Sequence, residues 1–176
     1  VAESVTAGGL SASISGEPGA SKYFQGGIVA YSIQSKKEIL GIDIDYAEKN
    51  NFANPFTTSE MARSVVKKLK SRIGLATTGY SLPTFREENK ELGQCALDVK
   101  IPYAVICLYD SHLDREIIHK VEYTKYNPNN NQTVEKANAQ VLFSITAHAL
   151  YKKYVRELTQ PKMQNALPAV PSMLSV

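Results

Sequence analysis

Short apolar, β-branched segments alternate with amphipathic stretches along most of this 176-residue chain. Residues 26–31 precede one stretch with helical periodicity, and residues 75–79 follow another. This alternation is typical of strands joined through helices, which lie on both faces of the sheet. Residues 102–109 and 117–123 are strand-like with no helix between them, so they predict one antiparallel hairpin. The pattern therefore predicts an α/β fold, a three-layer α/β/α sandwich with a mixed, mostly parallel sheet.

Apolar repeats and cap residues predict four helices. They cover residues 10–14, 33–40, 57–73 and 133–158. Ser32 is the expected N-cap of the second helix, and Gly16 and Gly41 end the first and the second. The third begins at a capping-box pattern, Thr57 followed by Glu60, and stops before Gly74. Residues 80–100 are polar, and we expect an irregular excursion or a short helix around 87–92 there.

Composition and charge exclude several classes of protein. Hydrophobic residues make up 43% and charged residues 21%, which fits a folded domain rather than a disordered or coiled-coil chain. No apolar run approaches the length of a membrane span, and the first residues do not resemble a signal peptide. The net charge of +3 is smaller than the basic footprint of a nucleic-acid binder. We expect a cytoplasmic protein with no membrane or nucleic-acid partner.

Cysteine and histidine residues provide no expected metal site or disulfide framework. Two cysteines are too few for such a framework, and the three histidines stand at no ligand spacing. The residues in question are Cys95, Cys107, His112, His119 and His148. We therefore expect no metal.

Ser4, Tyr31 and Lys36 are the candidate catalytic residues. Ser4 and Tyr31 end neighbouring predicted strands, and Lys36 lies on a helix turn whose side chains lean back toward that end of the sheet. A serine nucleophile with a lysine base requires such convergence, and the lysine must lose its proton from a reference pKa of about 10.4. Two simpler interpretations stay open here: Ser4 or Thr6 caps the first helix, and Lys36 is solvated.

Three segments of the first forty residues stand in a characteristic order. They are Ala2-Glu3-Ser4-x-Thr6-x-Gly8-Gly9, then Pro18-Gly19-Ala20-Ser21-x-Tyr23-Phe24-x-Gly26-Gly27-x-Val29-Ala30-Tyr31-Ser32, then Lys36 with Leu40-Gly41. In this order they resemble the C-terminal domain of the CinA family, and the resemblance continues weakly through the helix after Thr57 and through Thr78-Gly79. Members of this family include amidohydrolases that convert nicotinamide mononucleotide to nicotinic acid mononucleotide and ammonia without a metal.

The resemblance implies a role for each matching residue. Ser4 falls on the nucleophile, Lys36 on the base and Tyr31 on a tyrosine whose hydroxyl assists it. The N–H groups of the turn from Thr6 to Gly9 would hold the oxyanion, and five residues would contact substrate: Thr6, Gly8, Gly9, Thr78 and Gly79. The implied partners are a small nucleotide substrate and further copies of the chain in a homo-oligomer, with no cofactor.

The resemblance also implies a domain boundary. We expect residues 1–160 to form one CinA C-terminal-like domain whose first helix and most of whose first strand precede Val1. Residues 161–176 show no periodicity and predict a flexible tail or a strap on a partner.

The chain departs from the family pattern at four places. These are Val5 and Ala7 beside the nucleophile, Ile33-Gln34 after Tyr31-Ser32, the loop Tyr80-Ser81-Leu82-Pro83, and Asn131 and Glu135 where arginines that bind phosphate are expected. Lys22, Lys37 or Lys100 would have to compensate for the lost charge. The departures leave a second hypothesis open, a catalytically degenerate relative that serves as a binding or assembly module.

Overall fold

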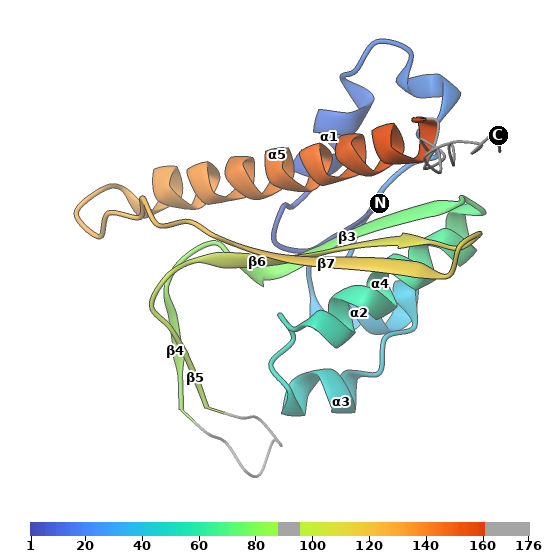
Figure 1. The fold of residues 1–176 in the computed structure, drawn as a ribbon. Helices are drawn as coiled ribbons and strands as arrows, with labels where there is room; N and C mark the ends of the chain where they lie inside the picture. The colour runs from blue at the N-terminus through green and yellow to red at the C-terminus, as the bar shows by residue number, and fades with distance from the viewer. Residues whose placement is uncertain (88–95, 161–176) are drawn as a thin grey trace, which may run out of the picture.

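The computed structural model describes residues 1–87 and 96–160, and a five-stranded sheet lies at its centre (Figure 1). Its strands, in spatial order, are β2 (Ile28–Val29), β1 (Ala2–Glu3), β3 (Ile73–Tyr80), β6 (Tyr103–Asp110) and β7 (Arg115–Glu122). β1 pairs in parallel with β2 and β3, whereas β6 pairs antiparallel with β3 and β7. Of these five strands only β6 runs against the others, so the predicted mixed, mostly parallel sheet is confirmed.

Helices cover both faces of the sheet, which confirms the three predicted layers (Figure 1). One face carries α1 (Gly9–Ser15) and α5 (Gln132–Thr159), and the other carries α2 (Ile33–Leu40), α3 (Ile44–Lys49) and α4 (Pro55–Leu69). A short 3₁₀ helix, η1 (Ala20–Lys22), follows α1.

The two faces of β3 and β6 contribute to separate apolar clusters, because successive strand residues point to opposite faces. Leu75 and Ile106 pack with α1 and α5, whereas their neighbours Ala76 and Cys107 pack with α4 residues such as Met61. The middle of each strand is therefore buried on both faces, and residues 75–76 of β3 and 104–108 of β6 are apolar, as expected for a sheet covered on both faces.

Helix α4 corrects the predicted capping box. Asn54 caps the helix by accepting a hydrogen bond from Thr57 N at 2.9 Å, and Pro55 takes the first helical position. Proline suits that position because its fixed φ is helical and its missing N–H has no partner there anyway. Lys70 adopts a left-handed conformation with φ 50° and ends the helix, so Ile73 begins β3 instead of extending α4.

The polar segment between β3 and β6 contains a two-stranded ribbon that the sequence analysis did not predict. β4 (Thr84–Arg86) and β5 (Leu97–Val99) pair antiparallel, and the ribbon projects away from the layers (Figure 1). The alternative helix around 87–92 falls largely on residues 88–95, which lie outside the described residues. The predicted tail, 161–176, also lies outside the described residues. Helix α3, capped by Asp43, was also missed.

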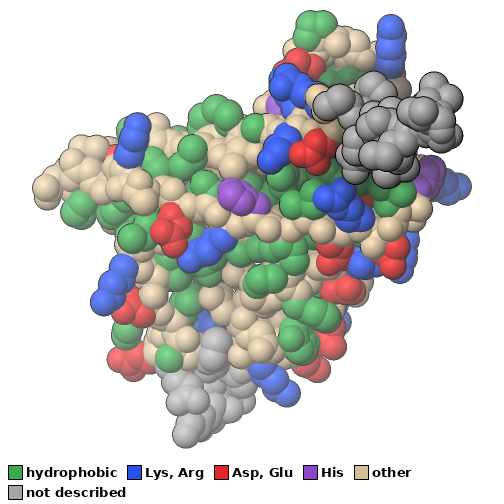
Figure 2. Space-filling model, in the orientation of Figure 1, with side chains coloured by type: hydrophobic (Ala, Val, Ile, Leu, Met, Phe, Trp, Pro, Cys, Tyr) green, Lys and Arg blue, Asp and Glu red, His purple; other side chains and the backbone are tan. Residues whose placement is uncertain are grey.

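Surface features of the described part are those of an ordinary charged exterior. None of its helices combines the length and the apolar content needed to cross a membrane. Acidic and basic side chains are interspersed on the face drawn in Figure 2 rather than separated by sign. On this face, charge does not mark out a binding surface.

Candidate active site

Ser4 lies where β1 ends, at the edge of the sheet to which the carboxyl ends of β2 and β3 also come. Its backbone N–H donates to Thr77 O of β3 at 2.9 Å, which continues the parallel ladder to this point. A cavity of about 340 Å³ opens beside Ser4. Ligands of α/β sheets bind at this edge, because the strands end there and the loops diverge.

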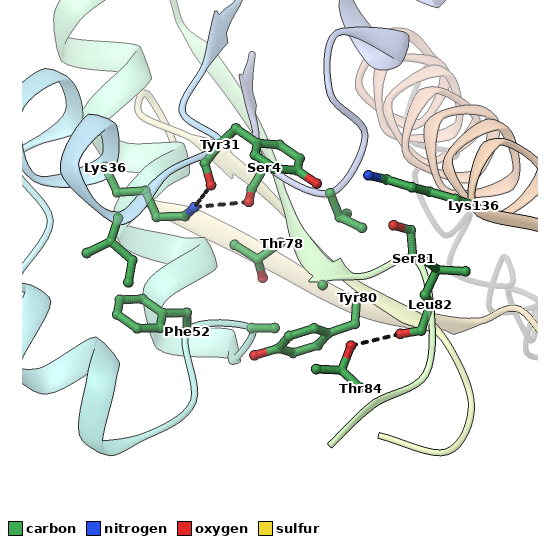
Figure 3. A pocket seen from close by; sticks show the side chains of 14 residues that line it. Ser4, Tyr31, Lys36, Phe52, Thr78, Tyr80, Ser81, Leu82, Thr84 and Lys136 are labelled. Carbon is green, nitrogen blue, oxygen red and sulfur yellow. Dashed lines mark hydrogen bonds between the residues drawn. The ribbon is translucent and has the colours of Figure 1, made fainter. Parts of the chain in front are cut away.

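Lys36 reaches Ser4 from the adjacent helix. Its Nζ donates to Ser4 Oγ at 3.0 Å and to the carbonyl oxygen of Tyr31 at 3.0 Å (Figure 3). It also donates to the carbonyl oxygen of Ala30 at 2.9 Å. Ser32 caps α2 as predicted, by accepting from Ser35 N, so the first turn of the helix presents Lys36 toward the strand end. The geometry required of a serine and lysine pair is therefore present, and the solvated alternative for Lys36 was wrong.

Burial prepares Lys36 to lose its proton. The residue is 4% exposed, and the resulting loss of hydration lowers its pKa to about 8. A neutral amine keeps two N–H donors and gains one lone pair. The carbonyls of Ala30 and Tyr31 can take the two donors, which leaves the lone pair for the Ser4 hydroxyl.

Tyr31 joins the site through its main chain. Its carbonyl oxygen accepts from Lys36, whereas its side chain is 54% exposed. Within residues 1–87 and 96–160 no hydrogen bond is recorded for the Tyr31 hydroxyl. The assisting role of that hydroxyl stays a prediction.

A buried carboxylate organises the turn behind Ser4. Glu3 accepts hydrogen bonds from Gly8 N at 3.0 Å, Leu10 N at 3.0 Å and Ser11 N at 2.7 Å, and from the hydroxyls of Thr6 and Ser11. Amides at the start of a helix favour a negative charge, so Glu3 stabilises α1 and the turn together. The sequence analysis missed this residue, although an acidic residue just before a glycine turn and a helix is a usable signal.

The structure does not bring Thr6, Gly8 and Gly9 to the cavity. Gly8 N is bound by Glu3, Gly9 N donates to Thr6 O at 2.9 Å, and the Thr6 hydroxyl lies between Glu3 and Thr77. The two glycines allow the turn to pack: Gly8 has φ 101°, and a Cβ on Gly9 would lie 2.6 Å from Ser144 Oγ. Thr78 and Gly79, in contrast, do line the cavity.

The remaining walls come from loops, from the first residue of α2, from the end of β3, from β4 and from α5. They consist of Val5, Ile33, Phe52, Ala53, Tyr80, Ser81, Leu82, Thr84 and Lys136. The Tyr80 hydroxyl donates to Asn51 Oδ1 at 2.6 Å, which holds that ring in place. Leu82 forms part of the wall and leaves the cavity open, so the changed loop does not block access to Ser4.

Lys136 is the site residue that sequence reasoning missed most clearly. It lies in the second turn of α5, and its ammonium is 5.8 Å from the centre of the Tyr31 ring. Lys22, Lys37 and Lys100, which were expected to compensate for lost arginines, are not among the lining residues. A basic residue near the start of the last helix was a possible signal, but only the rotation of that helix decides where it points.

No group of three or more His, Cys, Asp or Glu side chains in the described ranges is arranged to hold a metal ion.

Comparisons with known proteins point to a single family. The family model described as the CinA C-terminal domain matches residues 1–124. A CinA-like protein of Amoebophilus asiaticus is 48% identical over 83 residues, which cover 47% of this chain and 20% of that protein. A CinA-like protein of Flavobacterium psychrophilum is 35% identical over 104 residues, which cover 59% and 25%. The chain thus spans about a fifth to a quarter of these curated relatives.

Solved structures agree on the fold. The crystal structure of a competence-damaged protein (CinA) superfamily protein from Klebsiella pneumoniae superposes with a TM-score of 0.63, covering 88% of this chain and 85% of that chain. The two are 18% identical, so this likeness concerns the fold alone.

Proposed function

The chain belongs to the CinA family, and on that premise we propose that it is an amidohydrolase that converts nicotinamide mononucleotide to nicotinic acid mononucleotide and ammonia. The observation that carries the proposal is the 3.0 Å contact between Ser4 Oγ and the buried Nζ of Lys36. A hydroxyl becomes an effective nucleophile only when a base within hydrogen-bond distance takes its proton.

In the proposed first step, neutral Lys36 accepts the Ser4 proton while Ser4 Oγ bonds to the carboxamide carbon. Lys36 then gives this proton to the amide nitrogen, the C–N bond breaks and ammonia leaves. The product of this half-reaction is an ester between Ser4 and the nicotinoyl group.

In the second step, water attacks the ester carbon and Lys36 takes a proton from the water. The bond to Ser4 Oγ breaks, Lys36 returns the proton to Ser4, and the carboxylic acid product ionises on release. One base therefore serves both half-reactions.

Negative charge on the carbonyl oxygen needs a positive or N–H partner. The N–H groups of Gly8 and Gly9 already have acceptors inside the protein. Lys36, which becomes an ammonium on taking the Ser4 proton, stands beside the reacting carbon and supplies the nearest positive charge.

The test is ammonia release from nicotinamide mononucleotide by the wild type, by Ser4→Ala and by Lys36→Met. We expect each substitution to lower kcat/KM by about 10³-fold, because each removes half of the nucleophile and base pair. Melting curves confirm that the variants fold. Tyr31→Phe removes the hydroxyl and keeps the main-chain carbonyl that binds Lys36. A fall in kcat/KM of more than about tenfold in this variant would therefore assign the assisting role to the Tyr31 hydroxyl.

A second candidate function, the catalytically degenerate binding or assembly module, is favoured by one observation. Three of the four turn amides that the family resemblance assigns to the oxyanion, those of Ala7, Gly8 and Gly9, are already engaged, with Glu3 or with the main chain. If the wild type releases ammonia no faster than Ser4→Ala does, the amidohydrolase proposal fails and this second function is the one that stands.

A further inference from the structure

The cavity beside Ser4 carries an unbalanced positive charge. Its fourteen lining residues include two lysines, Lys36 and Lys136, and no carboxylate. A cleft lined by one sign of charge attracts ligands of the opposite sign. Lys36 is occupied by Ser4 and two carbonyl groups, so Lys136 is the cation available to a ligand.

Lys136 lies across the cavity from Lys36. Figure 3 shows Lys36 entering from one side and Lys136 from the other, with Ser4 and Thr78 between them and Ser81 next to Lys136. The ammonium of Lys136 lies over the exposed ring of Tyr31, and no ion pair or hydrogen bond is recorded for it in the part of the chain that the structure describes. A group bound there is separated from the reacting centre by the width of the cavity.

The neighbouring acidic residue does not cancel this charge. Glu135 is buried and accepts from Asn130 Nδ2 at 2.6 Å and Asn127 N at 3.3 Å, so its carboxylate is taken up by the loop before α5. The side chains of successive helix residues point about 100° apart. Glu135 can therefore face the loop while Lys136, the next residue, faces the cavity. Glu135, which stands where the resemblance predicts a phosphate-binding arginine, is therefore not among the residues that line the cavity.

We infer that Lys136, assisted by the Ser81 hydroxyl, binds the phosphate monoester of the substrate and thereby sets its specificity. The inference rests on the proposed function and adds the residue that recognises the anionic end of the nucleotide. Lysine binds phosphate as a point charge, so affinity depends on the charge more than on a fixed geometry.

The test measures binding rather than turnover, by titration calorimetry of Ser4→Ala protein. Nicotinamide mononucleotide is the probe, nicotinamide riboside lacks only the phosphate, and inorganic phosphate reports the anion site alone. We expect Lys136→Met to weaken binding of the mononucleotide about tenfold or more and to change riboside binding less than about twofold. Lys136→Arg should restore most of the affinity.

Lys153→Met is the matched control, because Lys153 is an exposed lysine of the same helix that does not line the cavity. The inference is overturned if Lys136→Met binds the mononucleotide as tightly as its parent does. It is also overturned if the substitution weakens binding of the riboside as much as binding of the mononucleotide, or if neither the mononucleotide nor inorganic phosphate binds. If the wild type releases no ammonia but phosphate probes bind in a Lys136-dependent way, the deamidase proposal fails and the anion site stands.

Discussion

Lys36 shows how one side chain links packing to chemistry. Taking its ammonium out of water costs free energy, which three hydrogen-bond acceptors only partly offset, and the pKa falls to about 8 as a result. A surface lysine with the reference pKa of about 10.4 would be neutral in a far smaller fraction of molecules at the same pH, so its lone pair would seldom be available to Ser4. The same burial that destabilises the charged form therefore produces the base.

Activity should depend on pH through Lys36. Since the neutral form is the active one, kcat/KM for nicotinamide mononucleotide should rise tenfold per pH unit below about 8 and level off above it. Initial rates of ammonia release between pH 6 and 9.5, taken in about half-unit steps, measure the profile. A flat profile over this range would remove Lys36 as the base.

At the scale of single elements, the start of α4 shows that one candidate N-cap residue can displace another. Asn54 with Pro55 starts the helix three residues before the pattern at Thr57, which leaves the Thr57 hydroxyl buried without a hydrogen-bond partner in the described structure. A buried hydroxyl without a partner lowers stability, because it has lost its water.

Two substitutions distinguish the observed cap from the predicted one. Asn54→Ala should lower the free energy of unfolding by about 1 kcal/mol by removing the cap. Thr57→Val keeps the shape and removes the unpaired hydroxyl, so it should raise that free energy by up to about 1 kcal/mol. Urea unfolding monitored by circular dichroism measures both, and a loss of stability in Thr57→Val would support Thr57 as the cap instead.

Over the whole molecule, Asp110 ties the sheet to helix α5. Its buried carboxylate at the end of β6 pairs with Arg72 just before β3 at 2.7 Å and accepts from the Tyr154 hydroxyl of α5 at 2.9 Å. Burial by itself would raise the pKa of Asp110, but the hydrogen bonds from Arg72, Tyr154 and His112 N outweigh it and lower the pKa to about 2.

The free energy of unfolding of the whole domain should depend on the protonation of Asp110 at acid pH. A carboxyl with a lowered folded pKa stabilises the fold above its unfolded value of about 3.9, and this contribution is lost as pH falls through 2. We expect Asp110→Asn to be less stable than the wild type by about 2 kcal/mol at pH 7, with the difference shrinking below pH 4. Urea unfolding at pH 7, 4 and 2.5 tests this, and a difference that does not change with pH would contradict it.

Signals that act over a few residues were sufficient for much of the fold. Glycines end α1 and α2, Ser32 caps α2, and the alternation of strands and helices predicts the layers. The approach of Ser4 to Lys36 also follows from local order, because the carboxyl ends of adjacent parallel strands meet at one edge. Their catalytic roles, the expected domain limits and the expected homo-oligomer stay predictions.

Tertiary structure alone decided which atoms face the cavity. Lys136 rather than Lys22, Lys37 or Lys100 provides the second charge. This outcome depends on the rotation of α5 and on its packing against a turn that lies more than a hundred residues away in the chain, where Gln140 donates to Val5 O and Ser144 lies beside Gly9. A sequence pattern sets the periodicity of a helix. The rotation of the helix about its axis is determined by which apolar surfaces are buried against one another.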